Sequence, residues 1–312
     1  MENSTYIRRK PAISVIIPCF NHGEFLDETV ESVLSQTFKN YEIIVIDDGS
    51  TDAGTLHALD RLEKRYPQIK IIRQSNGGPS NARNNGIKIS RGEYILPLDS
   101  DDIIEPRMLE KCHATLSKNP KLGFVYTYTH YFGAEDFVWK NPEYNFFDLL
   151  SSNQTTVSAL TRKKAWEEVG GFDEDERNGY EDWEFWINLG DHGWFGMLIR
   201  EPLFNYRKAG KSRMGTTELK YQKAVGYIRE KHRHLYSKES LEKIKKEWKS
   251  GKGDNILMNL VAKLEGAGLY DQALWKRHPI AAFGRLVPVR VKRKINSLFG
   301  KRIFDTSYYH RS

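Results

Sequence analysis

The sequence predicts an α/β fold: a mostly parallel sheet flanked by helices and followed by a C-terminal helical extension. Short β-branched apolar runs alternate with segments of helical periodicity. The runs recur about every 25–30 residues, the length of a strand plus a crossover helix. A polar turn follows each run. Because ligands of open α/β sheets bind outside the carboxyl ends of the strands, these turns predict one composite site.

The first half of the chain supplies the elements in order. The expected strands cover residues 13–17, 42–46, 69–72 and 94–96. Apolar positions at helical spacing predict the first two helices, and Pro79 opens the third. The turns that follow the strands are Asn21–Gly23, Asp47–Ser50, Asn76–Gly78 and Asp99–Asp102.

Charge divides the chain into two parts, which we assign as an α/β domain of residues 1–215 and a basic, mostly helical region of residues 216–312. Residues 1–200 carry 22 Lys and Arg against 31 Asp and Glu, whereas residues 201–312 carry 26 against 10. An acidic part suits metal binding, and a basic part suits an anionic surface such as a membrane leaflet or a nucleic acid backbone. Four apolar residues share one face of a basic helix near the end, which indicates either an interfacial helix or a docked surface helix: Val291, Ile295, Leu298 and Phe299.

Composition predicts the compartment. Apolar runs fall short of the roughly 20 residues that cross a bilayer, and residues 1–10 do not resemble a secretory signal. Cys19 and Cys112 form neither a CxxC pair nor a disulfide framework, which fits a reducing environment. We therefore expect a cytoplasmic protein that binds peripherally to the inner face of the cell membrane.

The acidic turn Asp99-Ser100-Asp101 is the main candidate for metal binding. Residues two apart at the end of an extended segment point to the same side, so Asp99 and Asp101 can face a ligand together while the side chain of Ser100 turns away within the same candidate ligand-binding turn. Mg²⁺ or Mn²⁺ takes carboxylate, phosphate and water oxygens. Acidic clusters also occur as solvated turns or helix caps.

Two further turns are candidates for nucleotide binding. In Asp47-Asp48-Gly49-Ser50, Gly49 suits a positive φ and Ser50 or Thr51 suits a helix cap, while Asp48 can accept a hydrogen bond from a pyrimidine N–H. The glycine-rich turn at residues 77–84 carries Arg83 one turn into the helix, where anions are favoured. It matches neither the dinucleotide-binding nor the P-loop pattern.

Together these motifs resemble the family 2 glycosyltransferases, which have the Rossmann-like GT-A fold. The resemblance extends over roughly residues 12–210, and five blocks follow the family's order: Ile13–Asn21, Gln36–Phe38, Ile46–Asp52, Gly77–Asn84 and Leu98–Asp102. It implies that residues 1–215 form a GT-A domain that binds a nucleotide-sugar and an acceptor.

The resemblance also implies roles for individual residues. Pro18 and Asp48 would line the uracil pocket, with Asp48 accepting the ring N–H, and Arg83 would lie close to the nucleotide. Asp99 would contact the ribose or support the metal, and Asp101 would bind the Mn²⁺ or Mg²⁺ that bridges the two phosphates.

A second acidic motif, Glu181-Asp182-Trp183, resembles the family's catalytic Glu-Asp motif. Asp182 would then take the proton of the acceptor hydroxyl as the sugar is transferred with inversion. The same acids would also be favoured in the first turn of a helix without any catalytic role. Downstream, Arg207, Lys208 and Lys211 are either phosphate contacts or surface charge.

The sequence thus predicts an inverting, metal-dependent glycosyltransferase. It would use a UDP-sugar and a glycan or lipid-linked acceptor in cell-surface glycan or polysaccharide synthesis. One alternative is a nucleotidyltransferase that forms nucleotide-sugars, but the turn after the first strand lacks the glycine-rich, lysine-bearing loop that such an enzyme would need. Another is a non-catalytic nucleotide- or nucleic-acid-binding module. We expect no nucleic-acid partner, because the acidic cluster repels a phosphate backbone.

Overall fold

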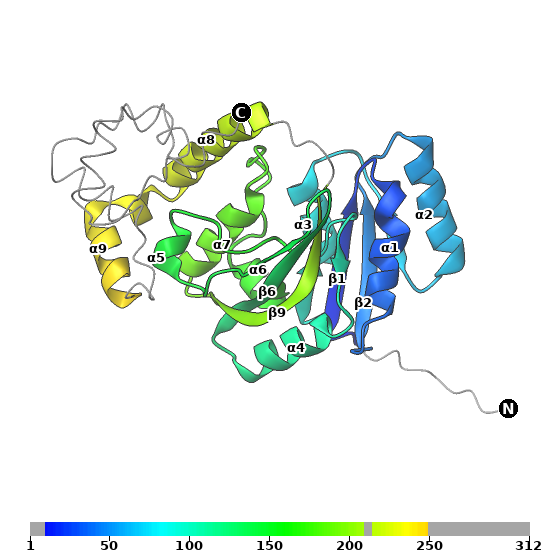
Figure 1. The fold of residues 1–312 in the computed structure, drawn as a ribbon, viewed down its shortest axis with the longest axis horizontal. Helices are drawn as coiled ribbons and strands as arrows, with labels where there is room; N and C mark the ends of the chain where they lie inside the picture. The colour runs from blue at the N-terminus through cyan, green and yellow to red at the C-terminus, as the bar shows by residue number, and fades with distance from the viewer. Residues whose placement is uncertain (1–9, 209–213, 249–312) are drawn as a thin grey trace. The chain divides into compact units, whose positions relative to one another are not determined.

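The computed structural model describes residues 10–208 and 214–248 (Figure 1). They belong to one compact unit, Met1–Asn255, and a second unit, Ile256–Ser312, lies outside the described residues. One nine-stranded sheet runs through the described part in the order β3-β2-β1-β4-β8-β6-β9-β5, with β7 paired to β6.

The first half of the sheet confirms the predicted parallel arrangement. β1 pairs in parallel with both β2 and β4, and β2 pairs in parallel with β3. The strands are β1 (Ile13–Cys19), β2 (Tyr41–Asp47), β3 (Lys70–Arg73) and β4 (Tyr94–Pro97). The helices between them are α1 (Gly23–Leu34), α2 (Ala53–Arg65) and α3 (Pro79–Ile89).

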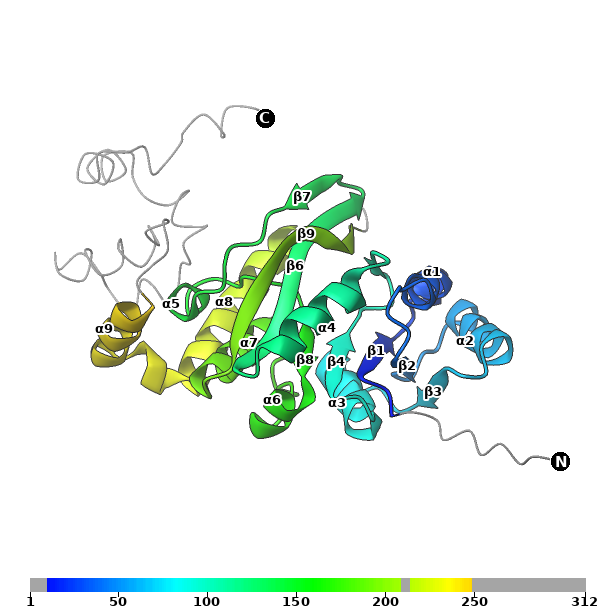
Figure 2. The same ribbon diagram turned by 90° about the horizontal axis from the view of Figure 1, so that it is seen from below.

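Helices cover both faces of this parallel half because alternate residues of β1 point to opposite layers. Ile13 is buried in one cluster with Leu26 of α1 and Leu59 of α2. Ile16 points the other way, toward α3, where a methyl group on Gly86 would lie 2.5 Å from the Ile16 side chain. Figure 2 shows α1 and α2 on one side of the strands and α3 on the other.

The second half of the sheet is mixed, which refines the prediction of a mostly parallel sheet. The pairs β4–β8, β6–β8, β6–β7 and β5–β9 are antiparallel, while β6 and β9 are parallel. These strands are β5 (Ile103–Ile104), β6 (Leu122–Gly133), β7 (Phe137–Trp139), β8 (Leu160–Arg162) and β9 (Phe195–Lys208). β6 and β9 form a long curled ribbon across the molecule (Figure 2).

Helices of the second half pack beside this ribbon. They are α4 (Met108–Lys118), α5 (Phe146–Leu149), α6 (Lys163–Glu168), α7 (Glu181–Asp191), α8 (Met214–Lys231), the 3₁₀ helix η1 (Arg233–Tyr236) and α9 (Lys238–Glu247). Among the described residues, no helix is both long and apolar enough to cross a bilayer.

The described C-terminal helices are joined to the α/β part by buried polar contacts. Lys231 Nζ and His232 Nε2 lie 2.8 and 2.7 Å from Oε1 of Glu184, a fully buried side chain of α7. The ring of Trp248 packs against Phe195 of β9 at 4.8 Å between centroids. The compact unit therefore continues past the boundary that we place after residue 215.

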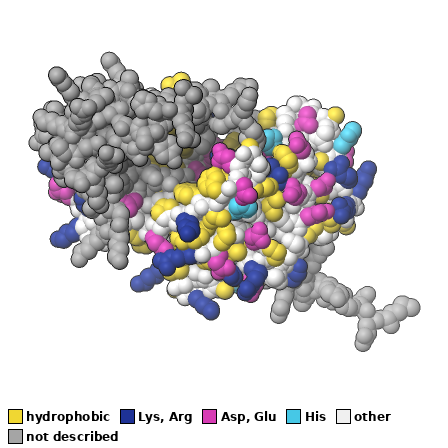
Figure 3. All heavy atoms as spheres, in the orientation of Figure 1, with side chains coloured by type: hydrophobic (Ala, Val, Ile, Leu, Met, Phe, Trp, Pro, Cys, Tyr) yellow, Lys and Arg dark blue, Asp and Glu magenta, His cyan; other side chains and the backbone are white. Residues whose placement is uncertain are grey.

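The membrane prediction falls largely outside the described residues. This applies to the apolar face formed by Val291, Ile295, Leu298 and Phe299. On the described part of the face drawn in Figure 3, acidic and basic side chains are interspersed. Membrane binding through the basic region stays a prediction.

Candidate active site

The turns after β1 and β2 are joined by Asn21, as the composite-site prediction requires. Asn21 has φ 54°, a left-handed conformation that asparagine tolerates better than most residues. Its Oδ1 accepts hydrogen bonds from the backbone N–H of Thr51 and Asp52 at 2.8 and 3.2 Å. Asp52 itself caps α2 by accepting from Thr55 N at 2.8 Å, so neither Ser50 nor Thr51 is the cap.

Asp48 organises the glycine turn after β3. Its Oδ1 accepts from Gln74 Nε2 at 2.7 Å and from Gly77 N at 2.9 Å, and its Oδ2 accepts from Gly78 N at 2.8 Å. Gly78 has φ 87°, which favours glycine. A carboxylate offers about four lone-pair sites, so this buried side chain retains capacity for one further donor such as a pyrimidine N–H.

Pro18 lies in β1, next to strand β2, which leads into the turn at Asp48. It is half-buried and pairs with Ile46 of β2. The next residue, Cys19, accepts the backbone N–H of Asp48 at 2.9 Å. Pro18 and Asp48 are therefore neighbours at the carboxyl edge of the sheet, and their contact with a uracil base stays a prediction.

The acidic turn after β4 has the predicted alternation. Asp102 N donates to Asp99 O at 3.1 Å, which closes the turn, and Thr29 Oγ1 donates to Ser100 O at 2.9 Å. Asp99 and Asp101 are partly exposed, whereas Ser100 and Asp102 are buried. The Ser100 side chain is buried, and the contact that ties Ser100 into the turn runs through its backbone oxygen.

The carboxylates of this turn repel one another. Burial and then the charge of Asp99 raise the pKa of Asp101, and burial together with Asp99 and Asp101 raises the pKa of Asp102 well above its usual range. Asp102 is already engaged, since its Oδ1 accepts from Arg207 N at 2.8 Å. Of the described residues, His22 approaches Asp101 with its Nδ1 3.8 Å from Oδ2.

This arrangement fits a divalent cation bound partly by a substrate. Clustered carboxylates with raised pKa values are stabilised by positive charge, and the side chain of Asp101 is partly exposed. Among the described residues, no group of three or more His, Cys, Asp or Glu side chains is placed to hold a metal ion. A cation at Asp101 would therefore complete its coordination with phosphate or water oxygens.

Arg83 joins this turn to α7, which is far away in the sequence. Its two terminal nitrogens lie 2.7 Å from Asp99 Oδ1 and 2.6 Å from Glu181 Oε1. Burial lowers the pKa of the guanidinium, but the charges of Asp99 and Glu181 outweigh burial and raise it. Both carboxylates already neutralise Arg83, so the contacts that the structure shows join the two acidic motifs, and the predicted place of Arg83 close to a nucleotide stays a prediction.

Asp182 follows Glu181 in the first turn of α7. Its Oδ1 accepts from its neighbour Trp183 N at 2.7 Å, and its Oδ2 accepts from Asn153 Nδ2 at 3.1 Å. Burial and then the charge of Glu181 raise the pKa of Asp182 to about 7. A carboxylate with this pKa can accept a proton near neutral pH.

Two tyrosines of the β6–β9 ribbon, Tyr131 and Tyr206, lie in the electrostatic field of the acidic residues. Burial and the charges of Asp102, Glu135 and Asp182 raise the pKa of Tyr131. Its ring lies 5.2 Å from that of Tyr206, measured between centroids. Tyr131 thus interacts electrostatically with both Asp102 of the acidic turn and Asp182 of the α7 motif.

The side chain of Arg207 is engaged by protein groups rather than left free to contact a phosphate. Its Nε donates to Asp101 O at 2.8 Å, its terminal nitrogen is paired with Glu28, and its guanidinium lies between the rings of Phe25 and Phe132 at 4.2 and 4.4 Å. This side chain therefore braces the acidic turn. Lys208 lies over the tyrosines, and Lys211 is outside the described residues.

Sequence reasoning missed three groups that shape the site. Glu181 was noted only as part of a motif, and its pairing with Arg83 required the fold. Asn153 sits in a polar stretch without any recognisable motif, and Tyr131 and Tyr206 belong to strands that were not predicted individually. The polar–aromatic alternation of residues 126–131 is the signal that could have located β6.

Comparisons with known proteins identify the family and the fold. The profile described as "Glycosyl transferase family 2" matches residues 14–203. The chain is 33% identical over 196 residues to a chondroitin synthase of Escherichia coli. This alignment covers 62% of this chain and 28% of the relative. It is 30% identical over 198 residues to a hyaluronan synthase of Pasteurella multocida, covering 62% of this chain and 20% of the relative. The chain thus spans less than a third of these relatives.

Solved structures share the fold. A crystal structure of S. aureus TarS in complex with UDP-GlcNAc superimposes with a TM-score of 0.62 at 17% identity, covering 92% of this chain and 79% of that one. A mannosyltransferase from Pyrobaculum calidifontis in complex with GDP-Man and Mn²⁺ gives a TM-score of 0.57 at 17% identity, covering 96% and 89%. The fold is GT-A, and the chain belongs to glycosyl transferase family 2.

Proposed function

We propose that the chain is an inverting, metal-dependent glycosyltransferase that moves a sugar from a UDP-sugar to a hydroxyl of a glycan or lipid-linked acceptor. The Arg83 bridge carries the proposal, because it sets the acidic turn at Asp99–Asp102 beside the motif that bears Asp182. The UDP-GlcNAc bound to TarS supports a uridine nucleotide. The polysaccharide synthases among the relatives support a glycan acceptor.

Different residues bind different parts of the donor and the metal. Pro18 and Asp48 bind the base, and the turn at Asp99–Asp102 faces the diphosphate. Asp101, with Asp99 beside it, would hold Mn²⁺ or Mg²⁺, which when bound supplies positive charge to the departing diphosphate. The Mn²⁺ of the mannosyltransferase complex supports a metal of this kind.

Asp182 removes the proton. As the acceptor oxygen attacks the anomeric carbon, its O–H proton passes to the Asp182 carboxylate, and the bond from that carbon to the phosphate oxygen breaks with its electron pair leaving on UDP. Attack from the face opposite the leaving group inverts the anomeric configuration. The raised pKa of Asp182 suits it to this step.

The basic region suggests where the reaction takes place. We propose a cytoplasmic location at the inner face of the membrane, because residues 201–312 carry 26 Lys and Arg against 10 Asp and Glu. Cosedimentation of the full chain with anionic vesicles, but not with neutral ones, tests this location. Equal recovery with both kinds of vesicle would refute it.

A thermal-shift panel tests the donor. UDP-, GDP- and dTDP-sugars are compared with and without Mn²⁺, because a ligand of the native state raises the melting temperature. We expect a UDP-sugar with Mn²⁺ to give the largest shift. A larger shift with a GDP-sugar, or shifts that do not depend on the metal, would contradict the corresponding part of the proposal.

A further inference from the structure

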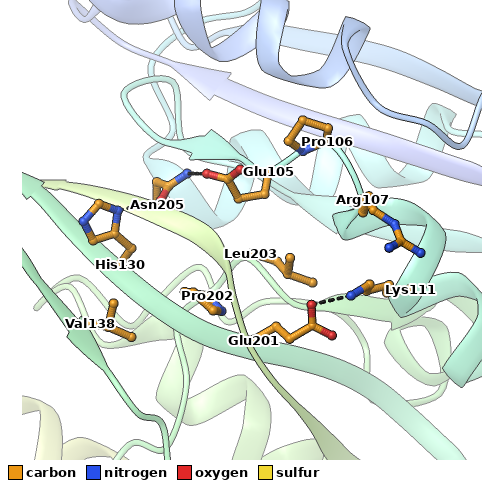
Figure 4. A pocket seen from close by; sticks show the side chains of 10 residues that line it. All are labelled: Glu105, Pro106, Arg107, Lys111, His130, Val138, Glu201, Pro202, Leu203 and Asn205. Carbon is orange, nitrogen blue, oxygen red and sulfur yellow. Dashed lines mark hydrogen bonds and ion pairs between the residues drawn. The ribbon is translucent and has the colours of Figure 1, made fainter.

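A cavity of about 630 Å³ lies between the start of α4 and the β6–β9 ribbon (Figure 4). Its walls come from the segment after β5, from α4 and from strands β6, β7 and β9. This volume falls within the range of small-ligand pockets, roughly 300–1,000 Å³. The proposed transfer reaction does not use it.

The cavity lies on the opposite face of the ribbon from the tyrosines of the candidate active site. His130 pairs with Asn205 across the ribbon, and both line the cavity. The next pair is Tyr131 with Tyr206. Because successive side chains of a strand point to opposite faces, a ligand in the cavity would not occupy the region between Asp101 and Asp182.

One wall of the cavity is a hydrogen-bonded chain of three polar side chains. Asn205 Nδ2 donates to Glu105 Oε1 at 2.8 Å, and Asn205 Oδ1 lies 2.9 Å from His130 Nδ1. These contacts hold the carboxylate, amide and imidazole in fixed positions (Figure 4). Glu105 and Asn205 keep some capacity to accept or donate, which suits a ligand with many hydroxyl groups, whereas both ring nitrogens of His130 are engaged and help to hold the wall in place.

The charged side chains around the cavity already have partners. Lys111 pairs with Glu201, Arg107 Nε lies 3.2 Å from Glu110 Oε2, and His130 Nε2 lies 2.8 Å from Asp136 Oδ1. An anionic ligand such as a phosphate or sulfate would have to compete with these carboxylates. The charge pattern therefore favours a neutral ligand.

Apolar side chains complete the lining. Pro106, Pro202 and Leu203 line the cavity, and Val138 on β7 also lines it with 43% of its surface exposed. Sugar rings present C–H faces as well as hydroxyl edges. The apolar side chains can pack against the C–H faces, and the polar wall can form hydrogen bonds with the hydroxyl groups.

We propose that this cavity binds a neutral saccharide segment of a glycan chain, at a site separate from the site of transfer. The identification of that glycan as the acceptor or product rests on the proposed function. Holding a long acceptor by a second segment raises its effective concentration at the active site. Long acceptors would then be better substrates than short ones.

Binding of defined oligosaccharides to the full chain tests this proposal. The probes are chitohexaose, cellohexaose, maltohexaose and an anionic hyaluronan hexasaccharide, followed by saturation-transfer NMR and calorimetry, with UDP and Mn²⁺ titrated in the same samples. Val138→Arg places a long charged side chain in the cavity, and His130→Ala interrupts the polar wall. Met197→Arg is the matched control, since Met197 is 42% exposed on β9 and does not line the cavity.

We expect at least one neutral hexasaccharide to bind, with affinity at least tenfold lower in Val138→Arg, several-fold lower in His130→Ala and within twofold in Met197→Arg. Affinity for UDP should stay within twofold in all three. Binding of none of the neutral probes, binding of hyaluronan alone, or binding unchanged in both cavity variants overturns the inference. If UDP fails to bind while a neutral probe still does, the proposed function fails and this site stands.

Discussion

Arg83 and Glu181 lie 98 positions apart in the sequence, and their side chains meet at 2.6 Å. The same guanidinium holds Asp99 at 2.7 Å. One buried cation thus fixes the acidic turn after β4 relative to the first turn of α7. The separation between the proposed metal ligand Asp101 and the proposed base Asp182 depends on this bridge.

Replacing Arg83 should destabilise the protein strongly. Arg83→Met leaves the carboxylate of Glu181 buried without its partner, and breaking a buried ion pair in this way costs about 3–5 kcal/mol. Arg73→Met is the matched control, because Arg73 also contacts two carboxylates, those of Asp60 and Glu63, but is 44% exposed. Its loss should cost less than about 1 kcal/mol.

Urea unfolding of both variants measures the difference in free energy. A similar small loss for Arg83→Met and Arg73→Met would show that the buried bridge does not hold the two acidic motifs together.

The reaction should depend on pH through Asp182. The base must be deprotonated, and its pKa is raised to about 7, so kcat/KM should rise with pH and level off above neutrality. At pH 6 the rate should be about tenfold below the plateau. A rate profile at saturating Mn²⁺, with donor affinity measured at each pH, checks this. A flat profile between pH 5.5 and 8 would count against the assignment.

The same raised pKa implies that Asp182 lowers stability at neutral pH. The folded state favours the protonated carboxyl. The free energy of unfolding that is lost through Asp182 is therefore zero below the ordinary pKa of an aspartate and reaches its full value above about pH 7. Asp182→Asn should therefore be more stable than the parent chain at pH 8, by roughly 1–4 kcal/mol, and the difference should disappear near pH 4. Chemical unfolding at the two pH values provides the measurement, and a destabilised variant at pH 8 would refute the argument.

Asp101→Asn should separate metal binding from folding. Removing one charge from the crowded acidic turn relieves repulsion, so without metal the melting temperature should rise by on the order of 2 °C. The additional thermal shift that Mn²⁺ gives with UDP should disappear. Asp27→Asn, at a partly exposed acid of α1 that pairs with Arg61, should keep that shift. If Asp101→Asn retains it, Asp101 is not a metal ligand.

The parallel half of the fold could be predicted from local sequence because its signals are local. Four short β-branched runs and the turns after them predict β1 to β4, and Pro79 begins α3 as expected. The alternation at Asp99 and Asp101 follows from the period of a strand, so the exposed side of the acidic turn was also predictable.

The second half depends on contacts that no local pattern encodes. The register of β6 with β9 shifts at several points, and β8, which lies between β4 and β6 in the sheet, is antiparallel to both. The hydrophobic periodicity of the sequence therefore did not reveal the ribbon of β6 and β9. Likewise, the sequence alone allows Arg207 to be a phosphate ligand. In the structure its guanidinium is paired with Glu28 and packs between two phenylalanine rings. Sequence reasoning named the acidic residues of the site and Arg83 and Arg207 beside them, but not the ion pairs that these two arginines form with Asp99, Glu181 and Glu28.

The most direct test compares Asp182→Asn with the parent chain for sugar transfer and for UDP binding in Mn²⁺. We expect transfer to fall by about 10²–10⁴-fold, because the acceptor loses its proton acceptor, while UDP affinity changes by less than twofold. If the variant transfers sugar at the parental rate, Asp182 is not the base and the central claim is wrong.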